Sequence, residues 1–223
     1  MGSEENVVIE VIGEGLADIG SVEKTDLPDS GIVPILLHKL CGKPGQMRVK
    51  RRPFAFLVGK KLPQKVQFAK RQACHNKSRG AVFVLDSEGG PMELKAKRGD
   101  LEDGRGRELP DFPMAIGVAQ PCIESWLLAA PEAIRRGLEF AATPQVPDAP
   151  ENLPAPCQDP RNNPKTALAT AAGHSGGKVS AAQMDKIAAA INDFAQLRAR
   201  CPLGFAPFAD EVDRQIRPLF SVR

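Results

Sequence analysis

The sequence predicts an α/β fold in which a mostly parallel central sheet carries helices on both faces. Three apolar runs, at residues 7–13, 81–86 and 114–119, are continuous and of strand length. Segments with helical spacing stand between and after these runs, so strands and helices alternate along the chain. A length of 223 residues with 42% hydrophobic residues is enough for one domain with a full core.

The first half of the chain is expected to contain two strands and two helices. The strand at 7–13 is rich in β-branched residues, and the polar segment 19–30 after it is expected to form an extended loop. The apolar stretch 32–40 ends just before a glycine and predicts a helix. A basic strand is expected within 47–58, and a proline in the first turn favours a helix at 63–76.

The middle of the chain repeats this alternation around a long connection. The strand at 81–86 is followed by residues 87–111, which are glycine-rich and charged and are expected to form a mobile loop. A third apolar strand is expected at 114–119. Two short helices should follow it, at 121–129 and 131–142.

The last third of the chain is expected to be helical after an irregular connection. Residues 143–164 carry seven prolines. Ser180 is placed to cap an amphipathic helix with apolar residues at helical spacing, and a last helix is expected at 205–220. We therefore expect a single domain over 1–223 with three parts: an α/β core at 6–142, the proline-rich connection at 143–164, and a helical part at 165–223.

Composition excludes several classes of protein. The five cysteines are widely spaced and form no CxxC pair, which argues against a disulfide framework or a zinc site and favours reduced thiols in the cytoplasm. No hydrophobic run is long enough to span a bilayer, so no membrane partner is expected. The acidic first five residues do not resemble a signal peptide.

Basic residues are concentrated in one segment. From Lys39 to Arg79 the chain carries thirteen lysines and arginines and no aspartate or glutamate. Such a segment is a candidate for contact with the phosphate backbone of DNA or RNA, and a solvated surface is the alternative. The candidate nucleic-acid-binding residues are Arg48, Lys50, Arg51, Arg52, Lys60 and Lys61.

Acidic residues follow two of the predicted strands. Glu14 and Asp18 come after the first strand, and Asp86 and Glu88 come at the end of the strand at 81–86. In open parallel sheets, ligands bind at the carboxyl ends of the strands. Carboxylate oxygens there are suitable ligands for one or two Mg²⁺ ions, and the alternatives are a plain turn or a helix cap. Magnesium at such a site favours chemistry at phosphate.

An ordered set of short motifs extends this interpretation. The acidic motifs at 14–18 and 86–88 are followed by IESWLLA at 123–129, by NPK at 163–165 and by Cys201-Pro202. Over roughly residues 7–210 the chain resembles a bacterial Toprim-like family of unknown function. That family is related to the nuclease domains of the overcoming-lysogenization-defect proteins.

The resemblance implies a Toprim-like fold and a metal-dependent active site. It implies a Mg²⁺ or Mn²⁺ site made by the carboxylates of Glu14, Asp18, Asp86, Glu88 and Glu124. Glu14 would also act as a general acid or base, and Lys165 would neutralise charge on the reacting phosphate. The motif Asp86-Ser87-Glu88 departs from the two aspartates of many Toprim domains, and its longer glutamate would shift the metal position.

The expected function is that of a metal-dependent phosphodiesterase or nuclease acting on DNA or RNA. The resemblance also implies a role in defence against phages and an ATPase protein partner. The alternative is a non-catalytic subunit that binds nucleic acid or a partner within an ATPase-containing complex. ATP hydrolysis by the chain itself is not expected, because Gly173–Lys178 lacks the first glycine and the Ser or Thr of a phosphate loop.

Overall fold

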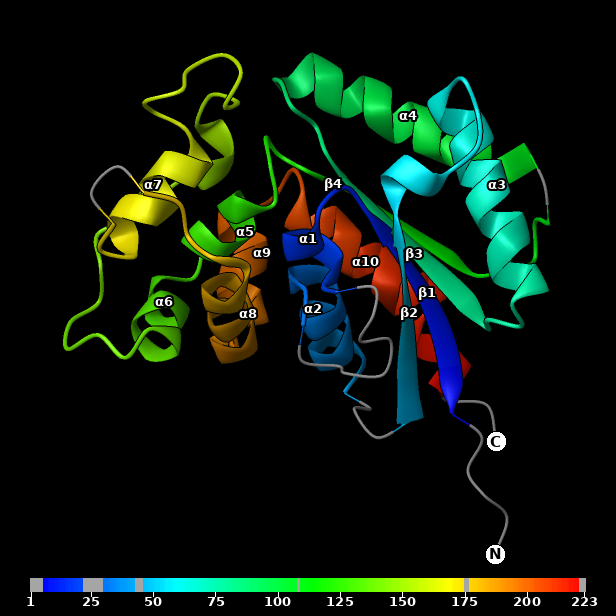
Figure 1. Ribbon diagram of the computed structural model, residues 1–223, viewed down its shortest axis with the longest axis horizontal. Helices are drawn as coiled ribbons and strands as arrows, with labels where there is room; N and C mark the ends of the chain where they lie inside the picture. Colours follow the sequence, from blue (N-terminus) through cyan, green and yellow to red (C-terminus); the bar gives the residue numbers. More distant parts are fainter. Residues whose placement is uncertain (1–5, 22–29, 43–45, 108, 175–176, 221–223) are drawn as a thin grey trace, which may run out of the picture.

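The computed structural model confirms the α/β fold and describes residues 6–21, 30–42, 46–107, 109–174 and 177–220. The segment 22–29 of the expected loop at 19–30 lies outside these residues. Within them, a parallel sheet has the strand order β2-β1-β3-β4 (Figure 1). The strands are β1 (Val7–Gly13), β2 (Met47–Pro53), β3 (Gly80–Asp86) and β4 (Met114–Ala119).

The parallel register brings the carboxyl ends of the strands to one edge of the sheet. Gly13 at the end of β1 pairs with Pro53 at the end of β2, and Asp86 at the end of β3 pairs with Ala119 at the end of β4. The basic strand is shorter than the expected 47–58, because residues 54–56 form the 3-10 turn η2 (Phe54–Phe56). The segments that follow β1, β3 and β4 therefore begin at the same edge of the sheet.

One face of the sheet is covered by α3 (Leu62–His75) and α4 (Pro91–Arg107) (Figure 1). Their apolar residues join side chains of the sheet such as Phe83 in one hydrophobic cluster. The expectation of a mobile loop at 87–111 was wrong, because most of it is α4. Leu94 and Leu101 lie two turns apart and are buried, while Gly104 lets the backbone of Pro63 approach closely.

The other face of the sheet is covered by α2 (Ile32–Cys41) and α10 (Phe205–Gln215) (Figure 1). Val11 and Val82 of the sheet belong to the same hydrophobic cluster as the apolar residues of these two helices. Gly117 of β4 permits close contact with α10, because a Cβ atom there would lie 2.8 Å from the ring of Phe208. The core is therefore divided into two layers by the sheet.

The remaining helices are α1 (Leu16–Ile19), α5 (Glu124–Leu128), α6 (Pro131–Gly137), α7 (Pro164–Ala171), α8 (Ala181–Ala190) and α9 (Phe194–Arg200). Trp126 of α5 is fully buried and stacks on Phe208 of α10. The amphipathic stretch after Ser180 forms two helices rather than one. The chain leaves helical geometry at Ile191, and the side chain of Asp193 then caps α9.

The proline-rich connection is irregular, as expected, but it is anchored to the core. It contains the short turn η3 (Pro150–Asn152), in which Glu151 is buried. The carboxylate of Glu151 accepts hydrogen bonds of 2.7 Å from the backbone N–H groups of Leu203 and Gly204. These bonds join the connection to the start of α10, and the described chain ends at η4 (Arg217–Phe220).

A helix that spans a bilayer must be both long and apolar. Among the described residues, no helix is both long enough and apolar enough to cross a membrane. The longest, α4, has 17 residues and is rich in charge.

Candidate metal centre

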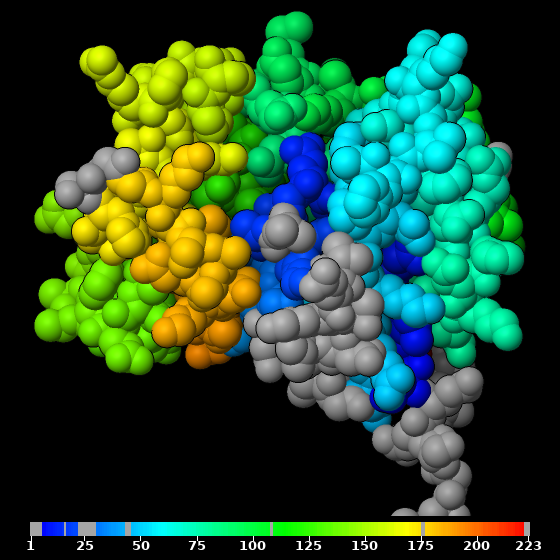
Figure 2. Space-filling view, in the orientation of Figure 1, coloured from blue at the N-terminus to red at the C-terminus, as the bar shows by residue number. Residues whose placement is uncertain are grey.

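The predicted acidic residues lie together at the carboxyl edge of the sheet. Glu14 follows β1 directly, Asp86 is the last residue of β3, and Glu124 begins α5 shortly after β4. These three strands are neighbours and run parallel, so the segments that follow them emerge side by side. In the space-filling view, the β1–α1 segment lies in a hollow between the α7 region and the segment after β2 (Figure 2).

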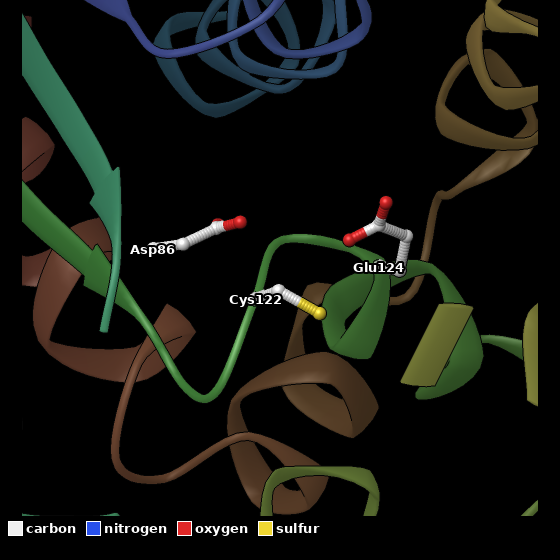
Figure 3. A group of neighbouring side chains, drawn as sticks. All are labelled: Asp86, Cys122 and Glu124. Carbon is white, nitrogen blue, oxygen red and sulfur yellow. The ribbon is translucent and has the colours of Figure 1, made fainter. Parts of the chain in front are cut away.

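The best-defined group at this edge is Asp86, Cys122 and Glu124. Potential ligand atoms of the three side chains all lie within 4.8 Å of one another, and the two carboxylates point toward the same space (Figure 3). The backbone N–H of Ile123 donates to Asp86 Oδ1 at 2.9 Å, which fixes the carboxylate relative to the β4–α5 connection. Cys122 was not predicted from the sequence, because an isolated cysteine carries no ligand pattern.

Glu124 has an unusual environment for a charged side chain. One carboxylate oxygen, Oε1, lies 3.8 Å from the Nζ atom of Lys165. The other, Oε2, is buried and has no hydrogen-bond partner among the described residues. A buried carboxylate oxygen without a partner is costly, so its presence points to a positively charged ligand.

The other carboxylates are close enough to repel one another. Burial raises the pKa of Asp18 to about 6, although a 2.8 Å hydrogen bond from the Gly15 N–H opposes the shift and Glu124 adds to it. Burial also raises the pKa of Asp86 well above its ordinary value, with further contributions from Asp18, Glu124 and Glu14. A bound cation would relieve this repulsion.

Glu14 belongs to the same electrostatic group. Burial raises its pKa, Lys97 opposes this shift, and Glu88 and Asp18 reinforce it. A carboxyl group with a raised pKa is better suited to exchange protons near neutral pH than an exposed one. The position of Glu14 is thus compatible with both the roles that the resemblance implies, metal ligand and general acid or base.

Two lysines complete the site. Lys165 lies in the first turn of α7, where the buried Asn163 side chain caps the helix by accepting from the Lys165 and Thr166 N–H groups. Burial alone would lower the pKa of Lys165, but the carboxylates of Glu124 and Asp86 outweigh it and the pKa is raised. Lys165 is therefore held in its charged form beside the acidic cluster.

Lys97 of α4 was not predicted from the sequence. Its Nζ atom donates to the backbone carbonyl of Asp86 at 2.7 Å and to Glu88 Oε2 at 2.9 Å. Glu88, whose side chain is 66% exposed, thus forms an ion pair with Lys97. The helical spacing of Leu94 and Leu101 could have predicted the helix that carries Lys97, but the many glycines of the segment favoured a loop instead.

The donor set fits a hard divalent cation. Asp86 and Glu124 would hold the ion through carboxylate oxygens. Asp18 and Glu14 act on Asp86 electrostatically, but neither belongs to the group of ligand atoms within 4.8 Å of one another. Burial raises the pKa of the Cys122 thiol strongly, with Glu124 adding to the shift. The carboxylate oxygens of Asp86 and Glu124 suit a hard ion such as Mg²⁺ or Mn²⁺.

The basic cluster on β2 is only partly presented to solvent. Arg48 and Lys50 are exposed, and Lys50 Nζ donates to the backbone carbonyl of Asn76 at 3.2 Å. Arg51 is only 5% exposed and donates to the Ser30 carbonyl. Arg52 forms an ion pair with the buried carboxylate of Glu10.

Lys60 and Lys61 occupy a different position from the rest of this cluster. Both are exposed and lie just before α3, in the segment that follows the carboxyl end of β2. This segment forms one rim of the hollow that contains the β1–α1 turn (Figure 2). Lys60 and Lys61 thus lie in the segment that leaves the carboxyl edge of the sheet at β2.

The chain was compared with protein-family models, with curated proteins and with solved structures, and none of the three comparisons found a match. The resemblance to the Toprim-like family therefore stays a prediction that rests on the ordered motifs. The parallel sheet and the carboxylates at its carboxyl edge are compatible with it.

Proposed function

We propose that the chain is a Mg²⁺- or Mn²⁺-dependent phosphodiesterase that cleaves DNA or RNA. The observation that supports this proposal is the meeting of Glu14, Asp18, Asp86 and Glu124 with Lys165 at one edge of a parallel sheet. Clustered carboxylates that repel one another are suited to a divalent cation, and a lysine beside them is suited to a phosphate.

In this proposal each side chain has a separate role. Asp86, Glu124 and Asp18 hold the metal through carboxylate oxygens, and the Ile123 N–H keeps Asp86 in place. The bound metal would act as a Lewis acid on the phosphate and lower the pKa of a water molecule. Glu14, whose pKa burial raises, accepts or donates a proton at its carboxylate.

The two lysines act on charge and position. Lys165, which the nearby carboxylates keep protonated, places a positive charge where negative charge develops on the phosphate. Lys97 does not face the substrate in this account. It positions the turn after β3 by bonding the Asp86 carbonyl and the Glu88 carboxylate.

The cellular compartment, the biological role and the protein partner are also proposals. All five cysteines are free thiols, which supports a reducing compartment such as the cytoplasm. A role in phage defence and an ATPase partner rest only on the resemblance. The alternative, a non-catalytic subunit that binds nucleic acid, differs from the leading proposal in one observable, cleavage by the isolated chain.

Cleavage assays test this proposal. We expect purified protein to cut plasmid DNA or RNA with Mg²⁺ or Mn²⁺ and to be inactive in EDTA. Glu14→Gln and Asp86→Asn should abolish cleavage, since each removes a charge at the carboxyl edge. Glu132→Gln is the matched control, because Glu132 is an exposed residue of α6 paired with Arg135. Salt-sensitive binding of nucleic acid without cleavage would favour the non-catalytic alternative.

A further inference from the structure

A basic pocket adjoins the proposed metal centre on the side of α7. It has a volume of about 470 Å³ and lies between α7, the end of the proline-rich connection and the segment before α8. Its cationic or titratable lining residues are Arg161, Lys165, His174 and Lys178, and no acidic residue of the described chain lines it. We call this cavity the α7 pocket.

The α7 pocket is connected to the metal centre through a shared wall. A smaller neighbouring cavity of about 190 Å³ is lined by Glu124, Lys165 and Lys178. Lys165 and Lys178 line both cavities, and Glu124 belongs to the metal centre. A ligand that extends from the metal centre past Lys165 would therefore enter the α7 pocket.

Two of the cationic side chains of the α7 pocket are available to a ligand. Arg161 and Lys178 are exposed, and within the described part of the chain neither side chain has a hydrogen-bond or ion-pair partner. On β2, by contrast, Arg52 is paired with Glu10 and Lys50 is bonded to the Asn76 carbonyl. The α7 pocket is thus the better supported anion site of the two.

We propose that the α7 pocket binds a phosphate of a single DNA or RNA strand, on a nucleotide next to the one at the metal centre. The inference rests on the proposed function. Its volume lies in the range of small-ligand sites, which admits a nucleotide of one strand but not a duplex. The two positive charges of Arg161 and Lys178 would attract the negative charge of a phosphodiester.

The pocket contacts the strand mainly through charge. It contains no phenylalanine or tryptophan, so stacking of bases contributes little, and His174 is already bonded to Gln183 at 3.1 Å. Charge-driven binding to a single strand weakens with salt by a slope of about −0.7 for each phosphate neutralised. Removing the two cations should therefore change the salt slope by about 1.4.

Binding of short oligonucleotides in EDTA tests the inference without cleavage. Fluorescence anisotropy would follow labelled single strands of DNA and of RNA, about 12 nucleotides long, between about 50 and 200 mM salt. We compare wild type with the double variant Arg161→Gln/Lys178→Gln. Arg48→Gln/Lys50→Gln is the comparison variant, because it removes the same charge from the other candidate binding cluster, on β2. A second variant, Thr170→Glu, adds a negative charge to the pocket lining and removes no cation.

The inference predicts at least about tenfold weaker binding for both α7 variants at low salt, a shallower salt slope for the double variant, and a clearly smaller loss for the β2 variant. Absence of strand binding by wild type, or equal losses in the α7 and β2 variants, would overturn it. Cleavage by wild type with unchanged binding in the α7 variants would overturn the inference and leave the proposed function. Strand binding that the α7 variants weaken, without any cleavage by wild type, would support the inference and contradict the proposed function.

Discussion

At the scale of single residues, the carboxylates of the metal centre make the metal-free protein less stable than it would be with neutral side chains. Glu124 Oε2 is buried without a partner, and burial raises the pKa values of Asp18 and Asp86. A folded-state pKa above the unfolded value means that the folded protein binds more protons in the interval between them. Stability therefore falls as pH rises through that interval.

Asp18 gives this effect a testable range of pH. Its pKa is about 6 in the folded protein, against an ordinary value of 3.8. In EDTA, the melting temperature should fall between about pH 4 and pH 7, and Asp18→Asn should raise it at pH 7 by about 2–6 °C. Mg²⁺ should stabilise wild type more than the variant. Differential scanning calorimetry measures all three, and a variant less stable than wild type at pH 7 would contradict the account.

Cys122 tests which atoms of the cluster bind the ion. Burial keeps its thiol protonated, so Cys122→Ala should change Mg²⁺ affinity less than about threefold. Asp86→Asn should lower that affinity by at least about tenfold, because it removes a charged oxygen ligand. Isothermal titration calorimetry with Mg²⁺ and with Zn²⁺ separates the cases. Loss of Mg²⁺ binding in Cys122→Ala alone would show that sulfur, not oxygen, dominates the site.

At the scale of secondary-structure elements, α4 determines how the turn after β3 is held. Lys97→Met would remove the bonds to the Asp86 carbonyl and to Glu88. We expect cleavage about 10–100 times slower and weaker Mg²⁺ binding, as for other residues that orient metal ligands. Lys95→Met is the control, because Lys95 is exposed on the same helix. Equal activity of the two variants would argue against a positioning role for α4.

The anchoring of the proline-rich connection is a separate matter of stability. Glu151→Ala would leave the buried N–H group of Gly204 and the partly buried N–H group of Leu203 without their acceptor. The expected loss is about 2 kcal/mol or more, or roughly 4–8 °C in melting temperature. Thermal melts followed by circular dichroism measure it. A change below about 1 °C would mean that the connection contributes little to holding α10.

Elements with strong local patterns were predictable from the sequence, and elements that depend on distant contacts were not. The strand at 81–86 is apolar throughout and forms β3 as expected. Because β1 and β3 are parallel neighbours, the meeting of Glu14 and Asp86 at one edge was also predictable. Helix α4 was not, because its glycines and charges oppose helix formation locally, while Leu94 and Leu101 gain stability only by packing against α3 and the sheet.

The parts of the site that were missed have the same cause. Lys97 reaches Asp86 only because α4 is a helix that packs against β4, the neighbour of β3. Cys122 joins the cluster only because the β4–α5 connection turns back toward β3. Conversely, Arg51 and Arg52 look like a surface patch in the sequence, yet one is buried and the other pairs with Glu10.

At the scale of the whole molecule, the strand order separates the two basic regions of the protein. β2 is one edge of the sheet, whereas α7 and α5 lie beyond the opposite side of β1 (Figure 1). The β1–α1 segment, which carries Glu14 and Asp18, lies in the hollow between the segment after β2 and the α7 region (Figure 2). A strand crossing this hollow would meet Lys60 and Lys61 on one rim and the α7 pocket on the other.

The central claim is that the carboxyl edge of the sheet holds a divalent metal ion. Crystals of the protein grown with Mn²⁺ test it most directly, because anomalous scattering locates the ion independently of activity. We predict a peak in contact with the carboxylates of Asp86 and Glu124, with Asp18 or Glu14 beside it, and its loss in Asp86→Asn. A map without a peak among these side chains, at Mn²⁺ concentrations that support cleavage, would contradict the account.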